Sequence, residues 1–359
     1  MIPIPRPDEV DADWMTHVLR ARGRLATAAR VVELEKSTCG TGQLGDSFRF
    51  TLRYAPDNAG PPTLVGKFTS QDPTSREFGR SSGYYRSEIL FYQELAGHLP
   101  VALPTAVHAR LGENETDFVL LMEDLAPARQ VDQLQGCSAE ESARVLGQAA
   151  ALHAATWRRA DLASKAWLGG PVGIFRHVTN TFADVVGGFP ALCGDLVAGA
   201  DLKEAAKLIP RAGAWQRVFS QPQCLWHSDL RADNVLFDAG AGRQPVVLLD
   251  WQGVGYGCGA IDVAYWLGTS MSVEQRRMHE RDLLDHYRRS LLSHGVRDYS
   301  ASQCWEDYRL HAIHGLQVGV FGLGAVKRTE RGDRMWKVWI ERTAAQVRDL
   351  ESYAVLDAR

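Results

Sequence analysis

The sequence predicts an α+β fold of two lobes, a small N-terminal lobe with an antiparallel sheet plus a helix and a larger, mainly helical C-terminal lobe with a β-hairpin. A chain of 359 residues is too long for one simple core and suits two lobes. Strand-like alternation recurs in the first third of the chain, and helical periodicity dominates from about residue 127. We therefore expect the N-terminal lobe, with its connector, over residues 1–126 and the C-terminal lobe over residues 127–359.

The expected N-terminal lobe opens with a helix over residues 8–22, where apolar residues recur at helical spacing. Two alternating runs then flank a glycine-rich turn that contains Gly40, Gly42 and Gly45, a pattern typical of a β-hairpin. TLVGKFTS predicts a third strand with Lys67 near its end, and YRSEILFYQELAGHL predicts a helix. FVLLMEDL predicts one more buried strand, which ends in the connector.

The expected C-terminal lobe begins with a capping box, because Ser138 is followed three residues later by Glu141. This pair predicts the start of a helix that runs to about Arg159. Further helical patterns occupy residues 201–219, 273–294, 300–322 and 332–353. Two strand-like runs, NVLF and PVVLLD, interrupt the helices and predict a hairpin.

Composition and charge exclude several classes of protein. A net charge of −3, with 40 basic and 43 acidic residues and no long single-sign runs, gives no footprint for nucleic-acid binding. The first residues, MIPIPRPDEV, lack the pattern of a signal peptide, and no apolar run reaches the length of a membrane span. Six scattered cysteines without a CxxC pair indicate neither a zinc site nor a disulfide framework. We expect a cytoplasmic protein with no nucleic-acid or membrane partner.

The stretch HSDLRADNVLFD, residues 227–238, carries the polar residues that phosphoryl transfer requires. The transfer needs a carboxylate that orients the attacking hydroxyl and accepts its proton, and metal ions that neutralise phosphate charge. Asp229 can supply the carboxylate, and Asn234 can supply a neutral oxygen ligand for Mg²⁺. Asp250, at the end of the following apolar strand, can add an anionic ligand. The spacing HxDxxxxN before such a strand predicts that the three residues lie at neighbouring strand ends.

Two residues of the N-terminal lobe complete this set. A strand lysine can reach the α- and β-phosphates of a nucleotide when a helix glutamate holds it in place. Lys67 and Glu88 occur in that order on an expected strand and an expected helix. Alone, Lys67 would more often be a solvated surface residue, and the three glycines would more often form a plain tight turn. The joint set favours a nucleotide site.

Together these motifs resemble the aminoglycoside phosphotransferase and choline kinase-like superfamily, enzymes with a protein-kinase-like fold that phosphorylate small molecules. LWHSDLRADNVLF and VVLLDWQGVGYGCGAIDVAYWLGTS are most similar to the ecdysteroid kinase-like branch and its bacterial relatives. The resemblance extends from the glycine-rich turn to Asp262 and is loose after about residue 275. It implies a bilobal protein-kinase-like fold and an ATP- and Mg²⁺-dependent kinase that moves the γ-phosphoryl group to a hydroxyl of a small molecule.

The resemblance also implies roles for individual residues. Asp229 would be the catalytic base, and Asn234 and Asp250 would bind Mg²⁺. Lys67 would bind the ATP phosphates beneath the glycine-rich turn, with Glu88 as its partner. Further implied positions are Leu121, Met122 and Glu123 beside the adenine, and Asp262, which would hold the catalytic loop in place.

Several positions depart from the family pattern. Ser228 stands where many relatives carry glycine, and the DWQ at residues 250–252 replaces the DFG of protein kinases, so phosphorylation of proteins is disfavoured. Arg231 lies where protein kinases often carry a lysine near the transferred phosphate, and it can either support charge there or point to solvent. Net basic stretches in the C-terminal region mildly favour a neutral or acidic acceptor over a polyamine sugar.

Three histidines attract attention beside these residues. His227 is interpreted as a buried, hydrogen-bonded organiser of the loop rather than a base, because Asp229 is the better base. His311 and His314, at helical spacing, resemble a metal-binding pair, but no third ligand accompanies them, so ordinary core or surface histidines are favoured.

Two functions from other classes stay open as alternatives. One is a nucleotide-binding pseudokinase, for which a missing lysine, base or metal ligand would be expected; none is missing. The other is a non-enzymatic protein that binds a small ligand on the same fold. Turnover of ATP that depends on Mg²⁺ and an alcohol separates an enzyme from both.

Overall fold

The computed structural model describes residues 2–40, 44–168, 188–193, 196–197, 199–217, 223–325 and 329–359. The chain divides into two compact units. Unit 1 consists of Met1–Leu99 and Leu103–Pro127, and unit 2 consists of Pro100–Ala102 and Ala128–Arg359. Strands dominate unit 1 and helices dominate unit 2, which confirms the predicted α+β class.

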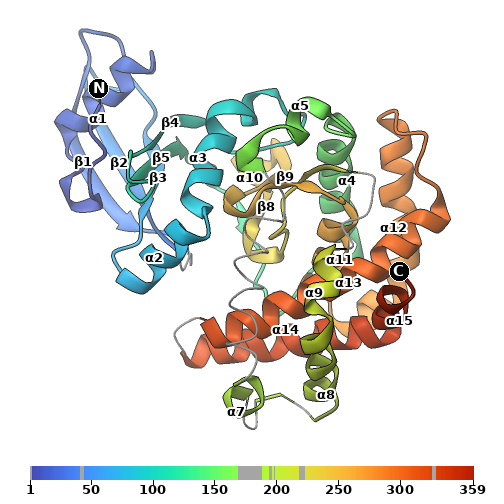
Figure 1. Cartoon of the computed structure of the whole chain (residues 1–359). Coiled ribbons are helices and arrows are strands. Elements are labelled where there is room, and N and C mark those ends of the chain that lie inside the picture. Colours follow the sequence, from blue (N-terminus) through green and yellow to red (C-terminus); the bar gives the residue numbers. More distant parts are fainter. Residues whose placement is uncertain are drawn as a thin grey trace. The chain divides into compact units, whose positions relative to one another are not determined.

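Unit 1 contains a five-stranded antiparallel sheet with the strand order β1-β2-β3-β5-β4 (Figure 1). Its strands are β1 (Arg30–Thr38), β2 (Gly45–Ala55), β3 (Thr63–Thr69), β4 (Ala106–Leu111) and β5 (Phe118–Glu123). Its helices are α1 (Ala12–Ala21), α2 (Pro73–Ser81) and α3 (Tyr84–Glu94), and short 3₁₀ turns cover Pro7–Glu9 and Ala96–His98. The predicted first helix, the strands on both sides of the glycine-rich turn and the third strand are all present.

The two faces of this sheet differ in chemistry, because successive side chains of a strand point to opposite faces. One face carries the apolar core of the unit, in which side chains of α1, β2, β3 and β5 pack together. On β3, Leu64 and Phe68 belong to this core, so Lys67 points to the opposite face. Helix α3 contacts β4 and β5 and carries Glu88, which pairs with Lys67.

Unit 2 is mainly helical and holds two small sheets, with the strand orders β10-β7 and β6-β8-β9. Its strands are β6 (Arg129–Gln130), β7 (Cys224–Trp226), β8 (Val235–Asp238), β9 (Gln244–Leu248) and β10 (Gly255–Gly257). Its shorter helices are α5 (Ala160–Ala163), α7 (Phe189–Cys193), α8 (Gly199–Leu208), α9 (Ala212–Arg217), α10 (Ala239–Gly242) and α15 (Ser352–Asp357). Its longer helices are α4 (Ala139–Ala155), α11 (Ala260–Ser270), α12 (Val273–Ser293), α13 (Ala301–Ala325) and α14 (Glu330–Asp349).

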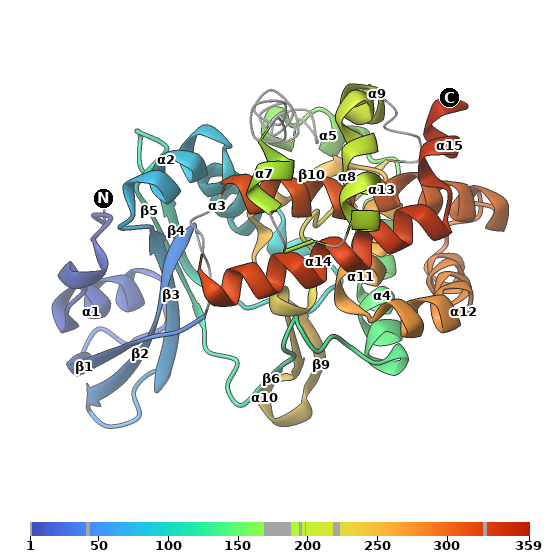
Figure 2. The ribbon, with the colours of Figure 1, turned by 90° about the horizontal axis from the view of Figure 1, so that it is seen from below.

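Helix α13 lies at the centre of the helical packing in unit 2. It packs against α11, α14 and α15, while α4 packs against α12 (Figure 2). The predicted hairpin is formed by β8 and β9, which pair antiparallel with Val235 opposite Leu248. No helix in the described ranges is long and apolar enough to cross a membrane.

The capping box at the start of α4 is confirmed. The Ser138 hydroxyl accepts a hydrogen bond from the Glu141 backbone N–H at 3.2 Å, and the Glu141 carboxylate accepts one from the Ser138 N–H at 2.8 Å. The helix ends at Ala155, earlier than predicted. Helix α11 was not predicted, because all its residues are buried and no polar face marks a helical period in its sequence.

Candidate active site

The loop between β7 and β8 is organised by His227, whose side chain is fully buried. Its Nδ1 accepts a hydrogen bond from the backbone N–H of Asp229 at 3.3 Å, and its Nε2 donates one to the carbonyl oxygen of Leu249 at 2.8 Å. The first bond needs a lone pair and the second needs a proton, so the imidazole proton resides on Nε2. One ring therefore connects the start of the loop to the segment after β9.

Asn234 turns its side-chain nitrogen towards Asp229. Its Nδ2 lies 2.8 Å from the backbone oxygen of Asp229 and 2.8 Å from Oδ2 of the same residue. Both partners are acceptors, so the amide oxygen of Asn234 points away from them. The structure thus brings together Asp229 and Asn234, the acid and the amide of the HxDxxxxN motif.

Asp250 follows β9 by two residues and adopts a left-handed backbone with φ of 62°. The backbone N–H of Leu249 donates to the carbonyl oxygen of Asn234 at 2.9 Å, so the residue before Asp250 pairs with Asn234. Aspartate tolerates the left-handed region better than most residues because its short side chain can hydrogen-bond locally. Asn234 and Asp250 are therefore near neighbours at one end of the β8–β9 hairpin.

The side chain of Asp262, on α11, binds the backbone of the loop. Its carboxylate accepts hydrogen bonds from the N–H groups of His227 at 2.7 Å and Ser228 at 2.8 Å, and Nε2 of His153 lies 3.2 Å away. The side chain is fully buried, and burial alone would raise the pKa of this carboxyl. Hydrogen bonds from His153 and from the backbone N–H of His227, with electrostatic attraction from both residues, outweigh burial and lower the pKa of Asp262 below its ordinary value, so Asp262 is anionic.

Ser228, at the centre of these contacts, has a left-handed backbone with φ of 67°. Glycine adopts this conformation without steric cost. This explains why a glycine is expected at this position in many relatives of the resembled family. One acceptor and one donor hold the serine backbone in place, since its N–H donates to the Asp262 carboxylate and its carbonyl oxygen accepts from Nε2 of His314 at 2.9 Å. The departure from glycine is therefore compatible with an ordered loop.

Three residues that contact the loop were missed from the sequence. The Tyr265 hydroxyl donates to Oδ1 of Asp229 at 2.8 Å, and the Ser270 hydroxyl accepts from the backbone N–H of Ala232 at 3.0 Å. The third is His314, which stacks on Trp215 with 5.9 Å between ring centroids. A signal for Tyr265 existed, because it follows Asp262 at an offset of three positions in a mostly apolar run, which places both residues on one face of a helix.

His314 and His311 are both buried core residues. Burial lowers the pKa of His314 to about 4 and, together with His314, lowers that of His311 to about 3. Neutral imidazoles in the core agree with the interpretation of these residues as ordinary core histidines. The described part of the chain contains no group of three or more His, Cys, Asp or Glu residues arranged to hold a metal ion.

Arg231 is enclosed by acids and an aromatic ring. Its Nε lies 3.3 Å from Oδ1 of Asp229, its Nη1 lies 2.5 Å from Oδ2 of Asp233, and its guanidinium carbon lies 5.6 Å from the ring centroid of Trp339. Burial by itself lowers the pKa of Arg231, but the charges of Asp229 and Asp233 raise it above its ordinary value. The side chain is 19% exposed, so of the two interpretations left open, a solvent-directed arginine is wrong.

In unit 1, Lys67 and Glu88 form a buried ion pair. The Lys67 ammonium lies 2.8 Å and 3.0 Å from the two carboxylate oxygens of Glu88, and the side chains are 12% and 3% exposed. Gly45 allows β2 to pass close by, since a Cβ there would lie 3.2 Å from Cε of Lys67. Lys67 and Glu88 are therefore not the solvated surface residues that a lysine and a glutamate more often are.

The other nucleotide-binding positions expected in unit 1, where the structure describes them, lie on the same sheet or beside it. Gly40 has a left-handed backbone with φ of 75°, whereas Gly42 lies outside the described residues. Met122 and Glu123 end β5, where Met122 pairs with Val65 of β3. The Glu123 carboxylate accepts two hydrogen bonds from Thr105, at 2.8 Å from its N–H and 3.0 Å from its hydroxyl.

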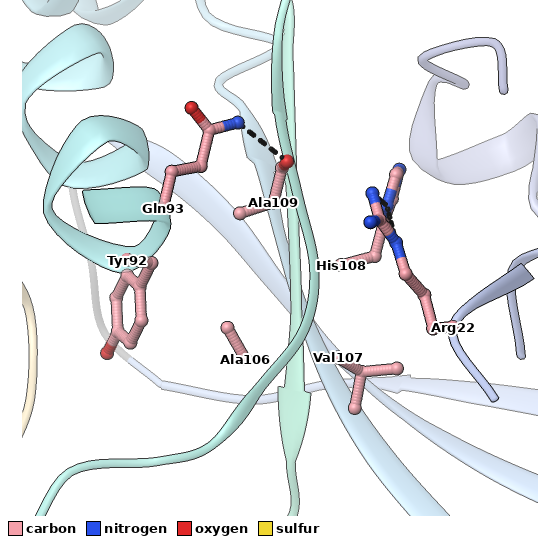
Figure 3. Close-up of a pocket in the computed structure, with 7 residues that line it drawn as sticks. All are labelled: Arg22, Tyr92, Gln93, Ala106, Val107, His108 and Ala109. Carbon is pink, nitrogen blue, oxygen red and sulfur yellow. Dashed lines mark hydrogen bonds between the residues drawn. The ribbon is translucent and has the colours of Figure 1, made fainter. Parts of the chain in front are cut away.

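Unit 1 also has a hollow of about 250 Å³ on the edge strand β4 (Figure 3). It is lined by Arg22, Tyr92, Gln93, Ala106, Val107, His108 and Ala109. Gln93 donates to the carbonyl oxygen of Ala109 at 2.9 Å, and Arg22 donates to Nδ1 of His108 at 2.9 Å. None of the residues expected to bind nucleotide lines this hollow.

Comparison with known proteins places the loop in a family context. Residues 214–296 match the ecdysteroid kinase-like family, and this range includes the whole loop and helix α11. An uncharacterized kinase-like protein of Caenorhabditis elegans is 34% identical over 91 residues, which is 25% of this chain. The matched stretch spans 24% of the length of that curated relative.

Solved structures share the fold over most of the chain. The microcompartment-associated aminopropanol kinase has a TM-score of 0.52 and 14% identity, with coverage of 95% of this chain and 97% of that one. A putative aminoglycoside phosphotransferase of Ralstonia eutropha has a TM-score of 0.54 and 13% identity, with coverage of 95% of this chain and 99% of that one. The Plasmodium vivax ethanolamine kinase has a TM-score of 0.52 and 10% identity, with coverage of 91% of this chain and 83% of that one.

These comparisons define the class of protein. The chain has a kinase-like fold, and its residues 214–296 match the ecdysteroid kinase-like family. The resemblance expected from the motifs, to the aminoglycoside phosphotransferase and choline kinase-like superfamily, is confirmed.

Proposed function

We propose that this chain is an ATP- and Mg²⁺-dependent phosphotransferase that moves the γ-phosphoryl group to a hydroxyl of a small molecule. The observation that carries the proposal is the contact of Asn234 with Asp229, 2.8 Å between Nδ2 and Oδ2. It supports two roles at once, because it orients a carboxylate and leaves an amide oxygen for a cation. The family match over residues 214–296 supports the same reaction class.

Asn234 and Asp250 fit a magnesium ion. Both offer hard oxygen donors, and Mg²⁺ in nucleotide enzymes commonly takes one or two protein ligands and completes its shell with water and phosphate oxygens. The left-handed backbone of Asp250, next to the pairing of Leu249 with Asn234, keeps the two side chains at the same end of the hairpin. When bound there, the ion would neutralise charge on the phosphates.

Asp229 is the residue that we assign as base. Its side chain is 23% exposed, so an acceptor hydroxyl can reach the carboxylate, while Tyr265 and Asn234 hold that carboxylate on opposite oxygens. A general base must lie within hydrogen-bond reach of the proton it accepts, and a fixed carboxylate satisfies this condition for a hydroxyl placed beside it. Arg231, held by two acids, adds positive charge next to the base.

Lys67 is the residue that we assign to the phosphates of ATP, together with the glycines Gly40, Gly42 and Gly45. Glu88 holds the ammonium group in a defined position, and a lysine held in this way loses less conformational freedom on binding phosphate. We assign Met122 and Glu123 to the border of the adenine. Unit 1 would thus bind the nucleotide, and the loop of unit 2 would supply the base and the metal ligands.

The proposal is tested by nucleotide binding and turnover of the purified full chain. Thermal shift with Mg-ATP and with ATP alone measures binding, and ATP consumption is followed against aminoglycosides, choline-like amines, sterols and hydroxy acids. We expect stabilisation by Mg-ATP and turnover with one acceptor class, a neutral or acidic one. Binding without turnover on any acceptor favours the pseudokinase, and stabilisation by an acceptor without nucleotide binding favours the non-enzymatic binding protein.

A further inference from the structure

Tyr265 reaches the carboxylate of Asp229 from the interior of unit 2. Its hydroxyl donates a hydrogen bond to Oδ1 over 2.8 Å, although the residue is only 1% exposed. Its ring centroid lies 4.9 Å from that of His314 and 5.5 Å from that of Trp339. Close packing on the ring leaves it little freedom, so the core itself aims the hydroxyl at Asp229.

The donors around Asp229 are distributed unequally over its two oxygens. Oδ1 accepts the Tyr265 hydroxyl and also lies 3.3 Å from Nε of Arg231. Among the side chains that the structure describes, Oδ2 contacts a single donor, Nδ2 of Asn234 at 2.8 Å. A carboxylate oxygen has about two acceptor sites. Oδ1 is therefore fully engaged, and Oδ2 keeps one site open.

We propose that Tyr265 is a positioning residue that reserves Oδ2 of Asp229 for the acceptor hydroxyl. This inference rests on the proposed function. The hydroxyl proton passes to Oδ2 while the hydroxyl oxygen forms a bond to the γ-phosphorus of ATP. The bond from that phosphorus to its bridging oxygen breaks, and the electron pair of this bond leaves with ADP. Without the Tyr265 hydroxyl, the carboxylate can rotate, and the orientation that meets the hydroxyl is populated less often.

The test replaces Tyr265 with phenylalanine, which keeps the packed ring and removes the hydroxyl. Phosphate release from Mg-ATP, with water as the acceptor, is measured on the full chain. We expect kcat to fall by about tenfold to a hundredfold while KM for Mg-ATP stays within about twofold, because only the reacting carboxylate is disturbed. An unchanged kcat, or a raised KM with kcat intact, overturns the role of Tyr265.

Two controls keep the result specific. Tyr353→Phe removes another buried hydroxyl, which donates to the carbonyl oxygen of Glu204 at 3.1 Å, and it should leave kcat and KM unchanged. In the Asp229→Asn background, Tyr265→Phe should cause no further loss, because Tyr265 acts through the carboxylate that is already absent. Additive losses in this cycle contradict the inference.

The same measurements separate this inference from the proposed function. A wild-type chain that neither binds nor hydrolyses Mg-ATP contradicts the proposed function. A wild-type chain that hydrolyses Mg-ATP beside an equally fast Tyr265→Phe variant contradicts only the role of Tyr265. Calorimetric affinity for Mg-ATP, equal in the variant and the wild type, verifies that the variant is folded.

Discussion

The side-chain nitrogen of Asn234 lies 2.8 Å from Oδ2 of Asp229 and 2.8 Å from the backbone oxygen of the same residue. One amide group thus fixes both the carboxylate and the backbone that carries it. Its oxygen lies at the other end of the planar amide group, and we propose that it binds a cation together with Asp250. The base and the metal ligands that we propose are therefore mechanically coupled through a single side chain.

Replacement of Asp229 by asparagine should remove most turnover and spare nucleotide binding. A positioned general base contributes about 10²- to 10⁴-fold to a proton transfer, and the amide cannot accept the proton. We expect kcat to fall by about that factor while the affinity for Mg-ATP stays within about threefold. Steady-state phosphate release and calorimetry measure the two quantities. Asp238→Asn, at the exposed end of the β8–β9 hairpin, is the matched control and should leave turnover unchanged. Normal turnover in the Asp229→Asn variant would contradict the assignment of Asp229 as the general base.

Replacement of Lys67 by methionine should weaken both nucleotide binding and the fold of unit 1. Removing one partner of a buried ion pair leaves the other charge uncompensated, at a cost of about 3 kcal/mol. The double variant Lys67→Met, Glu88→Gln should recover much of this stability but none of the nucleotide affinity, because the ammonium group is still missing. Urea unfolding and Mg-ATP titration compare the three proteins. Recovery of nucleotide affinity in the double variant would show that Lys67 acts only through stability.

Replacement of Asp262 by asparagine should destabilise unit 2 and slow turnover together. The anionic carboxylate accepts hydrogen bonds from two backbone N–H groups and contacts His153, and hydrogen bonds to charged groups contribute about 1.5–3 kcal/mol each. We expect a loss of about 2–4 kcal/mol in the free energy of unfolding. The comparison is with Asp161→Asn, whose carboxylate is exposed and pairs with Arg159. Equal effects of the two substitutions would contradict the loop-holding role.

Acid should destabilise the protein through its buried histidines. Burial lowers the pKa of His108 to about 4 and that of His311 to about 3, whereas unfolded histidine titrates near 6.5. The unfolded state therefore binds more protons below pH 6.5, and stability that is complete above this value is lost as the pH falls towards 4. Each histidine contributes a slope of about 1.4 kcal/mol per pH unit in this window.

Urea unfolding between pH 7 and pH 5 checks this dependence. His108→Gln should reduce the slope by the share of one histidine, since glutamine binds no proton, while its side-chain oxygen can still accept a hydrogen bond from Arg22. The variant and the wild type should converge in slope above pH 7. If the free energy of unfolding depends on pH equally steeply in the variant and the wild type near pH 5, His108 is not a residue that titrates in this window.

Local patterns predicted the elements and the loop well where their signal lies within a few residues. The capping box at Ser138 and Glu141 needs only four consecutive residues, and the alternation of β3 places Lys67 on the face opposite Leu64 and Phe68. Helix α11 lacked such a signal because it is buried on every side. Burial removes the polar face that periodicity needs, so sequence patterns missed the helix that holds the loop.

By itself, the sequence determined the residue types and spacing of the loop, since Asp229 and Asn234 lie five residues apart and meet through local backbone geometry. Only the tertiary structure decided what surrounds them. Tyr265 lies 36 residues from Asp229, and His314 lies 86 residues from Ser228, yet both contact the loop. Such contacts arise from the packing of whole helices around a shared core, which depends on the complete chain rather than on any short stretch of it.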